Sequence, residues 1–141
     1  MALNQNLKSD EELLAAAATA RKAAYAPYSK FTVGAAVRTK SEKIFSGCNV
    51  ENISLGLTIC AERSAVAAAI TAGERDLIEI GIVANSREPA LPCGACRQVL
   101  AEFNPTMKIL AATANGKKEE FNLADLLPKP VQGILESHRN V

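Results

Sequence analysis

Blocks of apolar residues separated by polar turns divide this chain into alternating helices and strands. An alanine-rich stretch and other long segments that mix apolar and polar residues predict helices. Short runs with apolar residues at every second position predict strands. The expected order is helix, strand, strand, helix, strand, helix, strand, strand, with one further helical turn. The expected ranges are 9–24 (helix), 31–39 and 44–48 (strands), 61–72 (helix), 78–84 (strand), 94–103 (helix), 108–114 and 119–123 (strands) and 124–127 (helical turn).

Particular residues mark the ends of these elements. Ser9-Asp10-Glu11-Glu12 has the Ser-x-x-Glu form of a capping box, which predicts that the first helix begins there, and Pro27 should end it. Gly73 is expected to cap the second helix, and Asn115-Gly116 predicts a tight hairpin turn. Residues 49–59 are harder to interpret and are expected to form a loop.

Strands that alternate with helices predict a sheet with helices on both faces, and the hairpins make that sheet mixed rather than purely parallel. The predicted fold class is α/β, a three-layer α/β/α sandwich with a five-stranded mixed sheet. The chain has 141 residues and contains no repeat, low-complexity tract or linker. We therefore expect one domain spanning residues 1–141.

The composition excludes several classes of function. Hydrophobic residues make up 48% and charged residues 22% of the chain, as in an ordinary globular protein. The net charge of +1, without a basic run, argues against polymeric nucleic acid as a partner. A polar N-terminus and the lack of a long apolar run argue against a signal peptide and a membrane span. Four cysteines then indicate a reducing compartment, so we expect a cytoplasmic protein.

Three cysteines are placed as ligands for one metal ion. Cys60 opens one predicted helix, Cys93 opens another, and Cys96 lies one turn further along, so the three sulfurs can face one point. Helix N-termini stabilise thiolates, and soft sulfur ligands favour zinc. Three protein ligands leave a position for water, as in catalytic zinc sites. We expect one Zn²⁺ per chain at these residues.

Charged residues flank the cysteines. Glu62 could face the open position and transfer protons between water and a substrate nitrogen, but it could also be a solvated glutamate at a helix start. Arg63 and Arg97 could lend positive charge or hydrogen bonds to the sulfurs, or both could be ordinary surface arginines. For Arg63 we favour contact with a sulfur, and for Arg97 both interpretations stay open.

Other interpretations of the cysteines explain less. A redox CxxC pair would leave Cys60 and Glu62 without a role. Cys48 could complete a structural Cys₄ site, but the spacing lacks a second CxxC, so we interpret Cys48 as a small buried hydrophobic residue. His138, the single histidine, lies in the C-terminal tail and is expected to be exposed.

The combination of Cys60-Ala61-Glu62-Arg63 with Pro92-Cys93-Gly94-Ala95-Cys96-Arg97-Gln98 closely resembles the small homotetrameric cytidine deaminases. The resemblance implies zinc-dependent hydrolytic deamination of cytidine and deoxycytidine in pyrimidine salvage, with a small-molecule nucleoside as the substrate and a homotetramer as the assembly. The related blasticidin S deaminases share the zinc motifs, so another aminopyrimidine nucleoside is the alternative substrate. A zinc-stabilised binding module is the non-enzyme alternative. Further similar segments are 25–31, 33–36, 47–52 and 126–128.

The resemblance also implies a substrate site. It places Phe31 against the pyrimidine, Asn49 and Glu51 on the ribose hydroxyls, and the backbone N–H of Ala61 on the base carbonyl. Without the resemblance, a core aromatic, a turn asparagine and a surface glutamate would be the simpler interpretations.

Two positions depart from the family pattern. Leu55 stands where many members carry a tyrosine. Val131 stands where members usually carry a phenylalanine that helps to cover a neighbouring subunit's site. Small side chains on the second predicted helix would allow helices of a tetramer to approach closely, although they could also pack only against the sheet. These residues are Ala61, Ala65, Ala68, Ala69 and Ala72.

Overall fold

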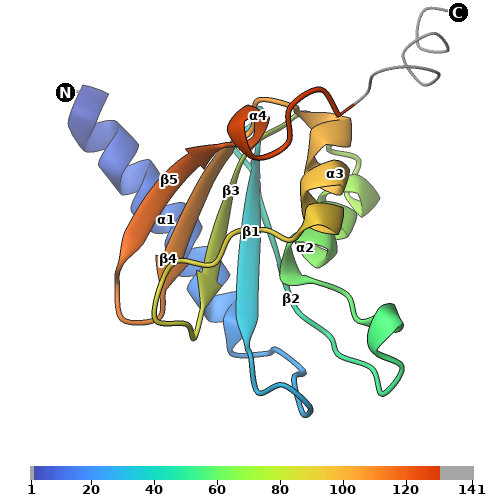
Figure 1. Cartoon of the computed structure of the whole chain (residues 1–141). Coiled ribbons are helices and arrows are strands. Elements are labelled where there is room, and N and C mark those ends of the chain that lie inside the picture. Colours follow the sequence, from blue (N-terminus) through green and yellow to red (C-terminus); the bar gives the residue numbers. More distant parts are fainter. Residues whose placement is uncertain (1, 131–141) are drawn as a thin grey trace, which may run out of the picture.

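The computed structural model describes residues 2–130 and builds them around a five-stranded sheet (Figure 1). Its elements are α1 (Ala2–Arg21), β1 (Val33–Thr39), β2 (Ile44–Cys48), the 3₁₀ turn η1 (Leu55–Leu57), α2 (Ala61–Thr71), β3 (Leu77–Ala84), α3 (Gly94–Phe103), β4 (Lys108–Thr113), β5 (Lys118–Asn122) and α4 (Leu123–Leu126). The strand order is β2-β1-β3-β4-β5. Strands β3 and β4 are parallel and the other neighbours are antiparallel, so the predicted mixed sheet is confirmed.

Helices cover both faces of the sheet, as the alternation of elements predicted (Figure 1). Helix α1 packs on one face, and α2 and α3 pack on the other. Strand β1 lies between β2 and β3, and all seven of its residues are buried. Val33, Ala35 and Val37 face α2 and α3, whereas Ala36 faces α1. Two apolar cores therefore share one sheet, and the cysteine-bearing helices lie together on a single face.

Two glycines allow helices to approach the sheet closely. A Cβ atom on Gly34 would lie 1.9 Å from the carbonyl oxygen of Ala17 in α1. A Cβ atom on Gly47 would lie 2.5 Å from the backbone nitrogen of Ala65 in α2. Backbone atoms already occupy both spaces, so any larger residue would push the helix away. Gly47 therefore sets the distance between β2 and α2, the helix that follows Cys60.

The alanines of α2 divide between the sheet and the surface. Ala61, Ala65 and Ala69 are completely buried in the core beneath α2 and α3. These three pack against the sheet, which was the alternative to close contact between the helices of a tetramer. Ala68 is half-buried and Ala72 is exposed.

Helix α1 begins at Ala2, so the predicted start at a Ser9 capping box is wrong. The preceding residues contain neither proline nor glycine and continue the helix without a break. The acidic residues after Ser9 form ion pairs instead: Asp10 lies 2.9 Å from the Lys108 amine, and Glu12 lies 3.8 Å from the Arg38 guanidinium. Their contacts are to strands, and a capping motif read from local sequence could not reveal them.

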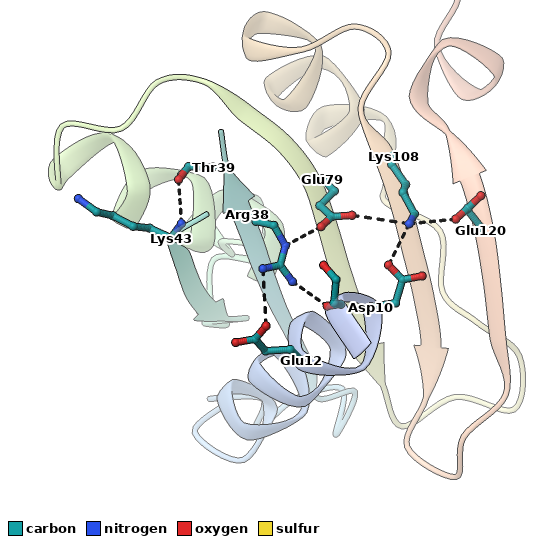
Figure 2. A network of polar contacts seen from close by, with 9 residues as sticks. Asp10, Glu12, Arg38, Thr39, Lys43, Glu79, Lys108 and Glu120 are labelled. Carbon is teal, nitrogen blue, oxygen red and sulfur yellow. Dashed lines mark hydrogen bonds and ion pairs between the residues drawn. The ribbon is translucent and has the colours of Figure 1, made fainter. Parts of the chain in front are cut away.

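These ion pairs belong to a network on the α1 face, which we call the ionic network (Figure 2). The Arg38 Nε lies 2.6 Å from Glu79 Oε1, and both residues are buried. Lys108 Nζ lies 3.7 Å from Glu79 Oε2 and 3.3 Å from Glu120 Oε1. Partial burial opposes the charge of Lys108, but Asp10, Glu120 and Glu79 raise its pKa above the usual value. The network joins α1 to β1, β3, β4 and β5.

The remaining elements end close to their predicted limits. Helix α1 stops at Arg21, and the next three residues form tighter i→i+3 turns. Gly73 and Gly116 have φ values of 89° and 102°, which suit the predicted cap and hairpin turn. No helix within residues 2–130 is long and apolar enough to cross a membrane. Val131 and His138 lie outside the described residues.

Candidate active site

Two helix N-termini position the three predicted cysteine ligands. Cys60 is the N-cap of α2 and Cys93 is the N-cap of α3. Cys96 lies in the first turn of α3 and is completely buried. Neither N-cap side chain makes a capping hydrogen bond to the backbone of its own helix, so both sulfurs are available to other partners. The positive ends of two helix dipoles therefore point toward one cluster of sulfurs.

The sulfur atoms have the spacing that a zinc ion needs. All three Sγ atoms lie within 4.8 Å of one another, with 3.9 Å between Cys60 and Cys93 and 3.5 Å between Cys93 and Cys96. Zn–S bonds of about 2.3 Å in a tetrahedron place two sulfurs about 3.8 Å apart. The donor set is soft, and the cluster fits one zinc ion per chain.

The cluster holds its protons unevenly. A hydrogen bond with Cys96 and the neighbouring Arg63 guanidinium lower the pKa of Cys60 to about 5. The same bond, together with burial and the nearby Glu62 carboxylate, raises the pKa of Cys96. One thiol of the pair is therefore deprotonated at neutral pH, while the other holds its proton until a cation replaces it.

Glu62 points into this cluster rather than into solvent. It is only 6% exposed, and its Oε2 lies 3.6 Å from the sulfur of Cys96. Burial raises the pKa of Glu62, and the negative charge of Cys60 adds to that rise. The solvated helix-start glutamate that was the alternative interpretation does not describe this residue.

The two arginines differ in what they contact. Arg63 Nη2 donates to the Cys60 sulfur at 3.5 Å and to the Thr58 carbonyl at 3.2 Å. Arg97 instead donates from Nε to the Pro92 carbonyl at 2.8 Å and from Nη1 to the Leu126 carbonyl at 3.1 Å. Within residues 2–130 no hydrogen bond joins Arg97 to a sulfur. Arg97 therefore fixes the backbone just before Cys93 and ties it to α4.

A pocket of about 210 Å³ opens beside the cluster. Each residue predicted to bind substrate lines this pocket, together with two of the cysteines and the buried carboxylate. These residues are Phe31, Asn49, Glu51, Ala61, Cys60, Cys93 and Glu62. Segments far apart in the sequence thus meet at one cavity beside the sulfur cluster.

The polar residues of the pocket already have partners in the protein. Asn49 is 7% exposed, and its side chain bonds the Phe31 carbonyl at 2.7 Å and the Val33 N–H at 2.9 Å. Glu51 Oε1 accepts from the backbone N–H groups of Tyr28 and Ser29. The Ser29 hydroxyl and these N–H groups keep the pKa of Glu51 below its usual value. An amide and a carboxylate can each accept further bonds, so both retain capacity for a ligand.

Sequence reasoning missed part of the pocket wall. Ser29, Val33, Thr58, Ala90 and Leu91 also line the cavity. Ala90 and Leu91 directly precede the Pro92-Cys93 motif, and Thr58 lies two residues before Cys60. Their closeness in sequence to the metal-binding cysteines was the signal that could have identified them as pocket residues. Cys48 is half-buried and lies outside the sulfur cluster.

Known proteins resemble this chain over most of its length. The profile of the family described as "Cytidine and deoxycytidylate deaminase zinc-binding region" matches residues 7–113. A cytidine deaminase from Halalkalibacterium halodurans is 45% identical over 117 residues, which cover 82% of this chain and 89% of that protein. A blasticidin-S deaminase from Bacillus cereus is 32% identical over 107 residues, covering 70% of this chain and 76% of that protein.

The similarity extends to solved structures. A crystal structure of cytidine deaminase from Burkholderia pseudomallei superposes with a TM-score of 0.81 at 46% identity, covering 84% of this chain and 96% of that one. The sequence match spans both cysteine segments and the helix and strand between them. By its sequence and its fold, the chain belongs to the cytidine and deoxycytidylate deaminase zinc-binding family.

Proposed function

We propose that this protein catalyses the hydrolytic deamination of cytidine and deoxycytidine, which converts cytidine to uridine and releases ammonia in pyrimidine salvage. The observation that carries the proposal is a buried carboxylate beside a three-cysteine cluster on the wall of one small pocket. The names of the relatives from H. halodurans and B. pseudomallei support the same activity. Four free cysteines agree with a reducing compartment, and we place the protein in the cytoplasm.

Cys60, Cys93 and Cys96 would hold the zinc ion in this scheme. Zinc bound there would lower the pKa of water to about 7, so that hydroxide would be available at neutral pH. Arg63 and the N-termini of α2 and α3 offset the negative charge of the sulfurs. Arg97 holds the carbonyl before Cys93 and keeps that sulfur in place.

Glu62 transfers the protons of the reaction. Its carboxylate accepts a proton from the attacking water and delivers it to the ring nitrogen N3, while the water oxygen bonds to C4. The carboxylate then accepts the remaining proton of that oxygen and passes it to the amine, so that the C4 carbonyl forms, the C4–N bond breaks and ammonia leaves. Burial of Glu62 suits this work, because it brings the pKa of a carboxyl group toward neutral pH. General acid and base catalysis of this kind contributes about 10²- to 10⁴-fold to the rate.

The nucleoside would occupy the pocket with its base near Glu62. Phe31 packs against the pyrimidine, and the backbone N–H of Ala61 at the start of α2 donates to the base carbonyl. Asn49 and Glu51 bond the ribose hydroxyls with the donor and acceptor capacity that their protein partners leave.

The similarity to a blasticidin-S deaminase favours a second candidate, another aminopyrimidine nucleoside. A zinc-stabilised binding module would need a fourth protein ligand, and within residues 2–130 the cluster contains three cysteines.

Turnover and metal content measured on one purified sample test the proposal. We expect about one zinc per chain, together with loss of cytidine absorbance and release of ammonia equal to the uridine formed. Chelator-treated protein is the negative control, and blasticidin S is assayed in parallel. Bound zinc without deamination of any of these nucleosides would contradict the proposal and favour the binding module.

The same proposal includes a homotetramer whose sites are completed by neighbouring subunits. Apolar side chains of segment 50–59 are exposed beside the pocket, with Ile53 82% and Leu55 71% accessible. Contact with another copy would remove this apolar surface from water. Light scattering should give the mass of four chains of 14.9 kDa each. Leu55→Glu should lower both the mass and the activity, whereas Ile78→Glu on β3 should change neither. A fully active monomer would contradict shared sites.

A further inference from the structure

The segment that carries Phe31 lies outside the regular strand pairing of the sheet. Residues 30–32 precede β1, and the strand ladder begins at Val33. Phe31 is 41% exposed, so packing alone fixes it weakly. A pocket wall needs a defined position to bind its ligand without an ordering cost, so other contacts must hold this segment.

Two asparagine side chains take the place of neighbouring strands. Asn49 donates to the Phe31 carbonyl at 2.7 Å and accepts from the Val33 N–H at 2.9 Å. Asn85 donates to the Lys30 carbonyl at 3.0 Å and accepts from the Thr32 N–H at 2.9 Å. Alternate backbone groups of an extended chain point to opposite sides, so the two amides grip the segment from both edges. We call this arrangement the asparagine clamp.

The clamp follows a backbone turn that needs support. Lys30 has a φ of 60°, a left-handed conformation that a lysine adopts only at a conformational cost. The carbonyl of Lys30 is the group that Asn85 binds. The backbone N–H of Asn85 also donates to the Thr32 carbonyl at 3.3 Å. Asn85 therefore fixes both the strained turn and the residue on the other side of Phe31.

We propose that Asn85 is a positioning residue for nucleoside binding, which holds the Phe31 wall of the pocket in place. This inference rests on the proposed function of the pocket. Asn49 lines the cavity, whereas Asn85 does not, so an effect of Asn85 on substrate must pass through the segment that it holds. Asn85 is exposed, so its removal takes little apolar surface from the core.

Kinetics of the zinc-loaded full chain test the proposal. Asn85→Ala removes both side-chain bonds and should raise the KM for cytidine about tenfold, with kcat within about twofold, because the proton-transfer groups are untouched. Asn85→Asp keeps an acceptor for the Thr32 N–H but cannot donate to the Lys30 carbonyl. Its KM should therefore lie between the values of wild type and Asn85→Ala. Zinc content and the melting temperature should stay close to wild type.

Asn104 provides the matched control. Its side chain donates to the Leu77 carbonyl at 2.9 Å and accepts from the Thr106 N–H at 3.1 Å. These bonds resemble those of Asn85 but lie at the opposite end of β3. Asn104→Ala should lower the melting temperature without changing KM.

Hydrogen exchange separates failure of this inference from failure of the proposed function. The Thr32 amide, which donates to Asn85, should exchange at least about tenfold faster in Asn85→Ala than in wild type. Wild-type KM in Asn85→Ala, or an unchanged Thr32 exchange rate, would overturn the inference. A wild-type chain that deaminates no nucleoside would defeat the proposed function, and the Thr32 exchange rate would then decide the inference alone.

Discussion

Each face of the sheet carries a partly buried polar cluster, and the two clusters differ in how far their positive and negative charges balance. On the α1 face, the ionic network surrounds Arg38 and Lys108 with carboxylates at 2.6 to 3.8 Å (Figure 2). On the opposite face, three cysteines and Glu62 lie together with Arg63 as the one cation bonded to a sulfur among residues 2–130. The first cluster is complete without a ligand, and the second lacks positive charge.

This difference separates a structural cluster from a chemical one. Buried charges with partners add specificity to a fold and need nothing from outside. A set of thiols of which Cys96 is buried, beside a carboxylate whose pKa is raised by burial, is satisfied only when a cation joins it. Helix N-termini supply part of that positive charge on the α2 and α3 face, and zinc supplies the rest.

Removing a sulfur from the second cluster should have the largest effect. Cys96→Ala should lower zinc content well below one per chain and reduce deamination by more than about 100-fold. Loss of a residue that only hydrogen-bonds to a metal ligand costs up to about 100-fold, and loss of the ligand itself should cost more. Atomic absorption and an ammonia assay measure the two quantities. Cys48→Ala is the control, because Cys48 lies outside the cluster. Zinc loss in Cys48→Ala alone would contradict the ligand assignment.

Removing a charge from the ionic network should affect stability and spare the chemistry. Glu79→Gln leaves Arg38 buried without its nearest carboxylate and should lower the free energy of unfolding by about 3 kcal/mol. The zinc content and kcat should not change. Urea unfolding of the zinc-loaded protein measures the effect.

The control for this change is a surface pair. Glu88 and Lys117 also lie 2.6 Å apart, but both side chains are largely exposed. Glu88→Gln should change the unfolding free energy by less than about 1 kcal/mol. Equal effects of the two substitutions would contradict the distinction between the buried network and the surface.

The apparent affinity for zinc should rise with pH, because a thiol must lose its proton to bind the metal. At pH 7 Cys60, with a pKa of about 5, is a thiolate, whereas the raised pKa of Cys96 keeps its proton in place. Zinc must displace that proton, so the apparent affinity should rise about tenfold per pH unit for each proton released. Competition with a zinc-binding dye between about pH 6 and pH 8 measures the slope. An affinity that falls as pH rises would have the wrong sign for this cluster.

The sequence was most informative where chemistry depends on local spacing. Cys93 and Cys96 lie one turn apart at a helix start, and Glu62 follows Cys60 by two residues, so their meeting could be predicted from the motif. Most helix and strand ranges were also predictable, because apolar periodicity is local, but the start of α1 was not. The α/β/α layers followed from the order of these elements.

The contacts that could not be predicted join distant parts of the chain. Asn85 binds Thr32 across 53 positions, and Lys108 binds Asp10 across 98. The acidic residues after Ser9 suggested a helix cap only because their strand partners were invisible in the local sequence. The same holds for Arg97, whose position beside Cys96 left a sulfur partner and a surface role equally open, whereas it binds two carbonyls.

Glu62→Gln tests the central claim most directly, because it changes one oxygen to nitrogen at the centre of the uncompensated cluster. The amide cannot carry the transferred proton, so kcat for cytidine should fall by about 10²-fold or more, while the zinc content stays at about one per chain. Both quantities are measured on the same sample, with unchanged circular dichroism as proof of folding. Near-normal kcat in this variant would contradict the assignment of Glu62 as the proton-transfer group.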